Sequence, residues 1–299
     1  MNREALRSQN IVLQRRYERK YYAPVRAAIM IPIDRTIAAV ERGGARSGLA
    51  YLHSTLSNTA LTEVVQSLAL DVGGRFARDQ WSRFQAQARG AKKHFEFKGS
   101  FNGAAFLDPA PFLNLKAGPF SLNESWAAWI KRFLFDFIYT KVSFSVFQTT
   151  KESLIPVLNE AISKGWNVSD TVSALEEEGS QLSASQAARV VRTEITRASN
   201  AGTAAASKVF PFIQVKEWMS AHDDRVRGLS RSDHASHIGL DGTIVPEEQD
   251  FIDPRNGDHL SFPGDPRASA ASTVNCRCTM AVVAKIGETG RLIPKKQIA

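Results

Sequence analysis

The chain's only two cysteines stand one residue apart near the C-terminus, in Asn275-Cys276-Arg277-Cys278. Two histidines, His234 and His237, precede them by about 40 residues. His and Cys are the usual ligands of zinc, and a structural zinc ion takes four ligands in a tetrahedron. We therefore expect zinc at His237, Cys276 and Cys278, with His234 or Asp224 as a further ligand. The C-x-C spacing is weaker than C-x₂-C and has no second pair, so two buried thiols beside ordinary loop histidines are the alternative.

The same region also permits a second chemistry, that of a metal-dependent nuclease or other hydrolase. Such a site needs carboxylates and histidines that converge on an ion. The candidates are Asp223, Asp224, His234, His237, Asp241 and His259. Their spacing matches no short catalytic motif, and the chain has no phosphate-binding G-x₄-G-K loop. We expect no catalytic residues and no enzyme activity.

Polar side chains recur on a helix predicted upstream of these loops. Arg189, Arg192 and Thr196 share one face by their i, i+3 and i+4 relations, and Glu194 and Arg197 form an i, i+3 pair on another face. Arg192 is suited to hold a carboxylate in a bidentate fork, for which Asp224 and Asp241 are the candidates. These residues are expected to anchor the loops that follow.

The elements that must position these residues form an α+β domain. Residues 148–208 predict three helices, over 151–163, 169–178 and 183–208, and the last begins with a Ser183/Gln186 capping box. A strand follows within 210–219, and short strands are expected at 243–245 and 279–283 between polar, turn-rich loops.

The first half of the chain predicts a mainly helical region. Apolar residues at helical spacing favour helices over 3–45 and 58–89, with breaks or kinks at prolines and at Gly43-Gly44. Residues 92–121 are rich in Phe, Gly and Pro and predict irregular structure. From Trp126 to Phe137 the aromatic spacing predicts an amphipathic helix, used in the core or at an interface with another protein.

Charge is distributed unevenly along the chain, whose formal net charge is +8. Residues 1–98 hold 17 Lys and Arg against 8 Asp and Glu, and the remainder is close to neutral. A basic third can contact nucleic acid or an acidic protein surface, or simply form a solvated helix face. The sequence shows no secretory signal and no apolar run of the length that a membrane span needs. Two cysteines one residue apart form no disulfide scaffold. We therefore expect the protein to be made and to reside in a reducing cytoplasm.

Taken in order, the motifs of the C-terminal half resemble the phage Mu F-like minor head proteins, also called the phage head morphogenesis domain. The resemblance covers about residues 150–285. One departure is the longer link between Arg227 and His237, which adds His234. The residues that carry the resemblance are Arg192, Glu194, Asn200, Trp218, Asp224, Arg227, His237, Asp241, Gly242, Pro263, Asn275, Cys276 and Cys278.

The resemblance implies a head morphogenesis domain at 148–285. Composition and charge alone predict a basic, mostly helical region at 1–147 before it, and residues 286–299 would form a C-terminal tail. It implies a minor structural protein of a tailed-phage head, made in the host cytoplasm and then located in the virion. Its partners would be the portal protein and other head proteins, with packaged DNA as a partner of the basic third and with roles in packaging or ejection. The alternatives are a phage-encoded enzyme or effector and a free DNA-binding protein.

Overall fold

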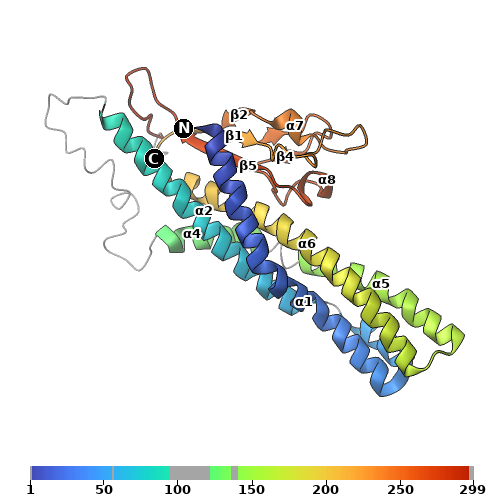
Figure 1. The fold of residues 1–299 in the computed structure, drawn as a ribbon. Coiled ribbons are helices and arrows are strands. Elements are labelled where there is room, and N and C mark those ends of the chain that lie inside the picture. The colour runs from blue at the N-terminus through green and yellow to red at the C-terminus, as the bar shows by residue number, and fades with distance from the viewer. Residues whose placement is uncertain (1, 56, 94–121, 136–140, 296–299) are drawn as a thin grey trace.

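The computed structural model describes residues 2–55, 57–93, 122–135 and 141–295, and Figure 1 shows their arrangement. Its helices are α1 (Arg3–Ser54), α2 (Thr59–Lys93), α4 (Leu122–Ile130), the π-helix η1 (Lys131–Phe135), α5 (Ser143–Lys164), α6 (Val168–Val209), α7 (His237–Leu240) and α8 (Ala270–Thr273). Its strands are β1 (Gln214–Met219), β2 (Ile244–Pro246), β3 (Phe251–Ile252), β4 (His259–Leu260) and β5 (Thr279–Ala284). The predicted α+β class, with a helical N-terminal region and small C-terminal strands, is confirmed.

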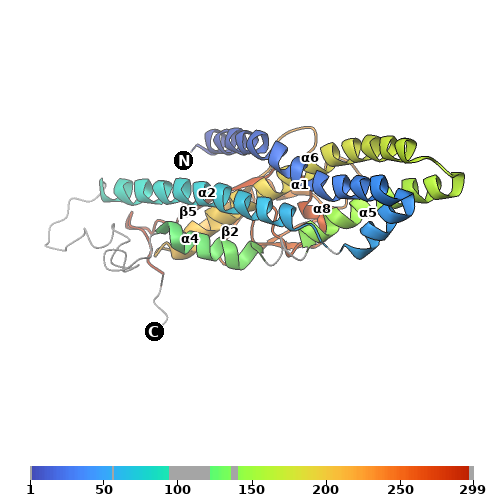
Figure 2. The same cartoon turned by 90° about the horizontal axis from the view of Figure 1, so that it is seen from below.

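Helices α1, α2 and α6 form an elongated bundle, with the strands gathered beside one end of it (Figures 1 and 2). α1 runs through Pro24 and Pro32 and breaks only at Gly43 and Gly44, where the φ of Gly44 is +73°. Beyond that break the chain turns back on itself, as the lighter blue end of α1 shows in Figure 1. A proline costs several kcal/mol in an isolated helix interior. Here α1 is held by apolar side chains that are fully buried against the other helices: Val25, Ile29, Ile33 and Val40.

The prediction of separate helices at 169–178 and 183–208 is wrong, because α6 is continuous for 42 residues. Gly179 does not end a helix: a Cβ there would stand 2.6 Å from Cγ2 of Ile33, so this glycine lets α1 and α6 approach closely. The expected capping box is also absent, since Ser183 is buried inside α6 and its hydroxyl donates to the carbonyl of Ser180. The preceding helix α5 ends at Gly165, whose φ is a left-handed +67°.

A second glycine contact joins α2 to α6. A Cβ on Gly202 would stand 2.0 Å from the carbonyl oxygen of Gly73, so the two helix backbones touch at this point. Neighbouring residues of α6 are mostly small, and Ile195, Ala198, Ala201 and Ala205 are buried in the main core. Gly73-Gly74 therefore does not interrupt α2, which continues to Lys93.

The predicted aromatic helix corresponds to α4 and η1, and it packs into the main core. Trp126, Ile130 and Leu134 are buried, and the indole of Trp126 lies 6.0 Å from that of Trp81 on α2. Phe137 and most of the Phe-rich segment at 92–121 lie outside the described residues. The described part of this helix thus serves the core of its own chain.

The strands form two small antiparallel sheets. β1 lies between β2 and β5 in a three-stranded sheet, and β3 pairs with β4 as a hairpin. The expected strands at 243–245 and 279–283 are present as β2 and β5, whereas β1 begins only at Gln214. The β3–β4 hairpin was not predicted. Met280, Val282 and Ala284 of β5 belong to the same buried cluster as residues of α1, α2, α4 and α6, so one core joins the sheet to the bundle. The predicted division into 1–147, 148–285 and 286–299 stays a prediction.

No helix among the described residues combines the length and apolar character that crossing a membrane requires.

Candidate functional site

One face of α6 carries buried polar side chains that hold the backbone of the C-terminal loops. The amide nitrogen of Asn200 donates to the carbonyls of Pro263 and Cys278, each at 3.1 Å, and its oxygen accepts from the backbone N–H of Met280 at 3.1 Å. The Thr196 hydroxyl donates to the carbonyl of Cys276 at 2.6 Å. A single helix therefore fixes both the proline-containing loop and the cysteine-containing loop.

A buried ion pair stands beside these contacts. Glu194 and Arg197 are 4% and 3% exposed and bond through a carboxylate oxygen and Nη1. Arg197 also donates through Nε to the carbonyl of Gly264 at 3.0 Å. Gly264 has a φ of +84°, and a Cβ there would stand 3.1 Å from the Cα of Arg197. The i, i+3 pair expected on this helix thus positions the loop from Phe262 to Pro266.

Nearer the surface, two further arginines hold the residues just before the first cysteine. Arg192 donates to the side-chain oxygen of Asn275 at 3.2 Å, and Arg227 donates to the carbonyl of Val274. Asn275 adopts a φ of +59°, and its N–H donates to the Thr193 hydroxyl at 2.9 Å. The prediction that Arg192 holds the carboxylate of Asp224 or Asp241 in a bidentate contact is wrong, because Arg192 donates to the side-chain amide of Asn275 instead.

Behind this turn, His237, Cys276 and Cys278 meet in the interior, and we call them the thiol site. Nδ1 of His237 lies 3.6 Å from Sγ of Cys276 and 3.5 Å from Sγ of Cys278. All three residues are at most 2% exposed. They are the one group of three or more possible metal ligands that the described part of the chain brings together, with all ligand atoms within 4.8 Å of one another.

Apolar and aromatic side chains enclose the thiol site. The ring of Trp218, which is 0% exposed, stands edge-on to the imidazole of His237 at 5.2 Å between centroids. The ring of Phe251 also stands edge-on to Trp218, with 5.3 Å between centroids. Leu240 and Leu260 complete the buried cluster around the two cysteines. The surroundings therefore have little solvent and a low effective dielectric constant.

Each member of the thiol site is placed by its own element. His237 opens α7, whose N-cap Ser236 is fixed by its backbone N–H donating to the carboxylate of Asp253 at 2.9 Å. Cys278 immediately precedes β5, and Cys276 follows the turn held by α6. A hydrogen bond from the Cys278 thiol holds the pKa of Cys276 well below its ordinary value, helped by His237 and opposed by burial. Burial raises the pKa of Cys278. The two cysteines thus influence each other's pKa in opposite directions.

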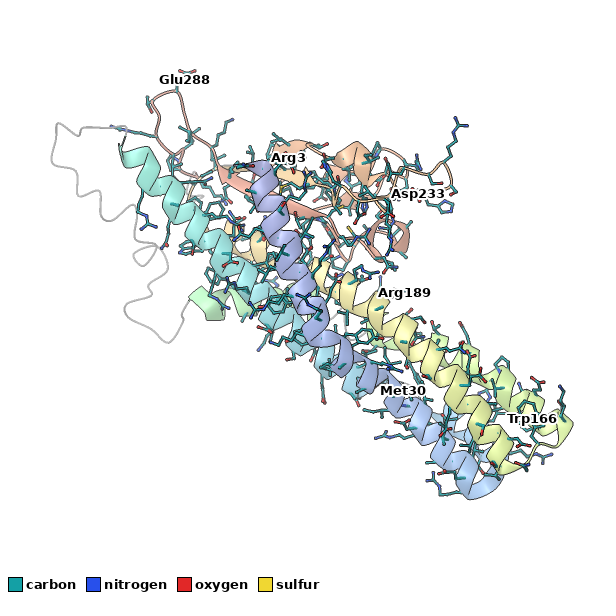
Figure 3. The ribbon with its side chains drawn as sticks, viewed as in Figure 1. Arg3, Met30, Trp166, Arg189, Asp233 and Glu288 are labelled. Carbon is teal, nitrogen blue, oxygen red and sulfur yellow. The ribbon has the colours of Figure 1, made fainter. Side chains whose placement is uncertain are left out.

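Asp241 and Gly242 form a second set of hydrogen bonds at the end of β1, next to Trp218. The Gly242 N–H donates to the carbonyl of Trp218 at 2.9 Å. Asp241 accepts from the Ser220 N–H at 2.7 Å, from His222 at 2.8 Å and from Arg3 at 2.8 Å. Burial acts to raise the pKa of Asp241, but these three donors outweigh it and hold that pKa at about 2. Figure 3 shows Arg3 beside the strands, at the start of α1.

The structure does not bring the remaining candidates into the site. Asp224, His234 and His259 are exposed, and none of them belongs to the metal-ligand group of the described residues. Asp223 lies outside that group as well and pairs with Arg277 at 2.7 Å. The convergence of acids and histidines that a nuclease needs is therefore not found among the described residues.

Three residues with structural roles were missed. Asp253 and Asp265 are both at most 1% exposed. Asp253 accepts from the backbone N–H of Arg255 in its own turn and from that of Ser236, and Asp265 accepts from the N–H groups of Ser261 and Arg267 in the proline loop. Asp-Pro and Pro-Gly-Asp sequences signal such turns and could have identified them. Arg3 could not be found in this way, because its partners Glu217 and Asp241 lie more than 200 residues away.

With the geometry in place, comparison with known proteins identifies the region. Residues 153–281 match the family model described as Phage Mu protein F like protein. The Bacillus subtilis (strain 168) protein named "Uncharacterized protein YqbB" is 28% identical over 134 residues, which make up 45% of this chain and 42% of that protein. The chain thus matches less than half the length of this curated relative, and no solved structure matches it. The resemblance is confirmed over residues 153–281, the region that contains α6, the loops that it anchors and the thiol site.

Proposed function

We propose that the chain is a minor structural protein of a tailed-phage head, placed at the portal or in the head interior and acting in head assembly. The observation that carries this proposal is the match of residues 153–281 to the Phage Mu protein F like family, which points to head morphogenesis. The contacts of the signature residues support a role without turnover. Their polar groups form hydrogen bonds within the chain: those of Asn200 and Arg227 to loop backbone carbonyls, and that of Arg192 to the side-chain amide of Asn275.

The first experiment asks whether the protein is part of the particle. Procapsids and filled heads are separated on gradients, and the polypeptide is quantified in each by mass spectrometry against the major capsid protein. The proposal expects a constant low copy number in both kinds of particle. A protein abundant in infected cells and absent from both would contradict it. A portal-deleted phage then separates the two locations: loss of incorporation supports a portal site, and retention supports the head interior.

We further propose that the basic third contacts packaged DNA through α1. Arg15, Arg16 and Arg19 are exposed and form no ion pair with any residue that the structure describes; we call them the arginine face. A groove between α1 and α6 continues this face and is lined by Arg15, Arg19 and Arg192, with Glu18 as its carboxylate. Burial raises the pKa of Glu18, against the lowering effect of Arg192, Arg277 and Arg15.

Such a face would bind DNA phosphates without reading sequence. Neutralising three phosphates predicts a slope of about −2.7 for log K against log salt concentration. Changing Arg15, Arg16 and Arg19 to Gln should remove most of that slope. The matched control changes the exposed Arg35, Arg42 and Arg46, which lie on the same helix toward its turned-back end. Equal effects of the two triple variants on fluorescence anisotropy titrations would contradict the assignment of binding to this face.

A further inference from the structure

We propose that the thiol site binds one zinc ion, through Nδ1 of His237 and the Sγ atoms of Cys276 and Cys278. The first support is geometric. Zinc–sulfur bonds of about 2.3 Å and zinc–nitrogen bonds of about 2.0 Å at a tetrahedral angle place sulfur and nitrogen about 3.5 Å apart. In the structure these atoms are 3.6 Å and 3.5 Å apart, which matches the spacing around a shared zinc ion.

The second support is the balance of charge in a buried place. Two thiolates and a neutral imidazole carry a charge of −2, and a divalent cation brings the cluster to zero. Because burying a net charge among Trp218, Leu240 and Phe251 would be costly, the neutral combination is favoured. A monovalent copper ion would leave one negative charge in the same pocket. Magnesium and calcium prefer oxygen ligands, of which the site has none.

The third support is that the ligands are already held in place. The carbonyls on either side of Arg277 are fixed by α6, that of Cys276 by Thr196 and that of Cys278 by Asn200. Asp253 fixes the residue before His237. Nε2 of His237 is buried and has no hydrogen-bond partner within the described residues, so in this structure the imidazole's polar contacts are to the two thiols.

The site so defined has three protein ligands. No fourth His, Cys, Asp or Glu of the described chain lies within 4.8 Å of them, so we assign the fourth position to a water molecule. His234 and Asp224, the further ligands expected from the sequence, are exposed and outside the group. The ion would join α7 to the start of β5, two elements about 40 residues apart in sequence, and its role would be to lock the domain.

The test begins with metal content. The full chain is purified under reducing conditions without added chelator, and zinc is measured per chain by mass spectrometry. The proposal expects close to one equivalent, removed by chelation and restored by zinc addition. Cobalt(II) taken up in its place should give the thiolate-to-metal absorption and the intense visible bands of tetrahedral coordination. Both cysteines should react with a thiol reagent only after the metal is removed.

Variants then locate the ion. Cys276→Ser, Cys278→Ser and His237→Ala should each lose most of the metal, whereas the matched control His234→Ala should keep one equivalent. If a site variant fails to fold, the cobalt spectrum and the thiol reactivity of the unchanged chain still decide the matter. A folded, reduced chain that takes up neither zinc nor cobalt under saturating conditions overturns the proposal. So does retention of one equivalent by all three site variants. Head incorporation is scored separately, so failure here leaves the proposed function intact.

Discussion

The contact between Gly202 and Gly73 gives the sharpest test of how the bundle is held. An alanine at position 202 would place its Cβ 2.0 Å from the carbonyl oxygen of Gly73, 2.7 Å from its carbonyl carbon and 2.8 Å from its Cα. All three atoms belong to the backbone of α2, so no side chain can rotate away. To regain an ordinary contact of 3.4 Å, the helices must separate locally by about 1.4 Å, the difference between 3.4 Å and 2.0 Å.

The magnitude follows from two opposed effects. Overpacking of this kind costs about 1–3 kcal/mol, and the absence of a flexible neighbour puts this site at the upper end. Alanine returns about 1 kcal/mol relative to glycine in a helix interior. We therefore expect Gly202→Ala to lower the free energy of unfolding by about 2 kcal/mol.

The matched control is Gly74→Ala, on the same helix as Gly73. A Cβ at position 74 meets only Nη1 of Arg78 at 3.6 Å, which is an ordinary contact with a flexible side chain. This variant should gain up to about 1 kcal/mol from helix propensity alone. Urea unfolding followed by far-ultraviolet circular dichroism measures both. A Gly202→Ala protein as stable as the unchanged chain would refute the close backbone contact.

Three further predictions concern charged groups. Glu194→Gln should lower the free energy of unfolding by roughly 3–5 kcal/mol, because it removes the carboxylate that bonds to the buried guanidinium of Arg197. The control Glu160→Gln breaks an exposed pair with Lys164 and should lower it by at most about 1 kcal/mol. Similar urea midpoints for the two variants would contradict the burial argument. Asp241 has a folded-state pKa of about 2, below the ordinary 3.8. The stability that its carboxylate contributes is therefore present above about pH 4 and is lost as the pH falls toward 2. Asp241→Asn should flatten this part of the plot of unfolding free energy against pH, whereas the control Asp224→Asn should leave it unchanged. Lys216 is buried, and burial lowers its pKa to about 8. Between about pH 8 and 10.5 the unfolded chain therefore binds more protons than the folded chain, so the free energy of unfolding should rise with pH through that range. A Lys216→Met protein that keeps the rise would exclude this lysine as its source.

The helices and most strands could be predicted because their signals are local. The apolar spacing of α1, α2 and α4 needs no knowledge of partners. The continuity of α6 could not be predicted, since Gly179 looks like a helix stop until Ile33 of α1 is seen beside it. The β3–β4 hairpin has two residues in each strand, too few for a recognisable alternation.

The candidate site shows the same division between local and distant information. The sequence indicated that His237, Cys276 and Cys278 could meet, because these residue types suit one ion. It also proposed His234 or Asp224 as a further ligand and could not exclude them, because their exposure in the loops depends on how the chain folds. It also assigned Arg192 a carboxylate partner, and the structure provides the amide of Asn275 instead. Pairing over 80 or more residues is decided by the fold rather than by residue type.

The start of α1 is held by residues that lie more than 200 positions later in the sequence. Arg3 pairs with Glu217 and Asp241, and Leu6 is buried with Met219 of β1 and Ala281 of β5. During synthesis, these first turns of α1 can therefore take their final position only after β1 and β5 have left the ribosome. Docking of the start of α1 is thus a late step, which follows the synthesis of the strands that hold it.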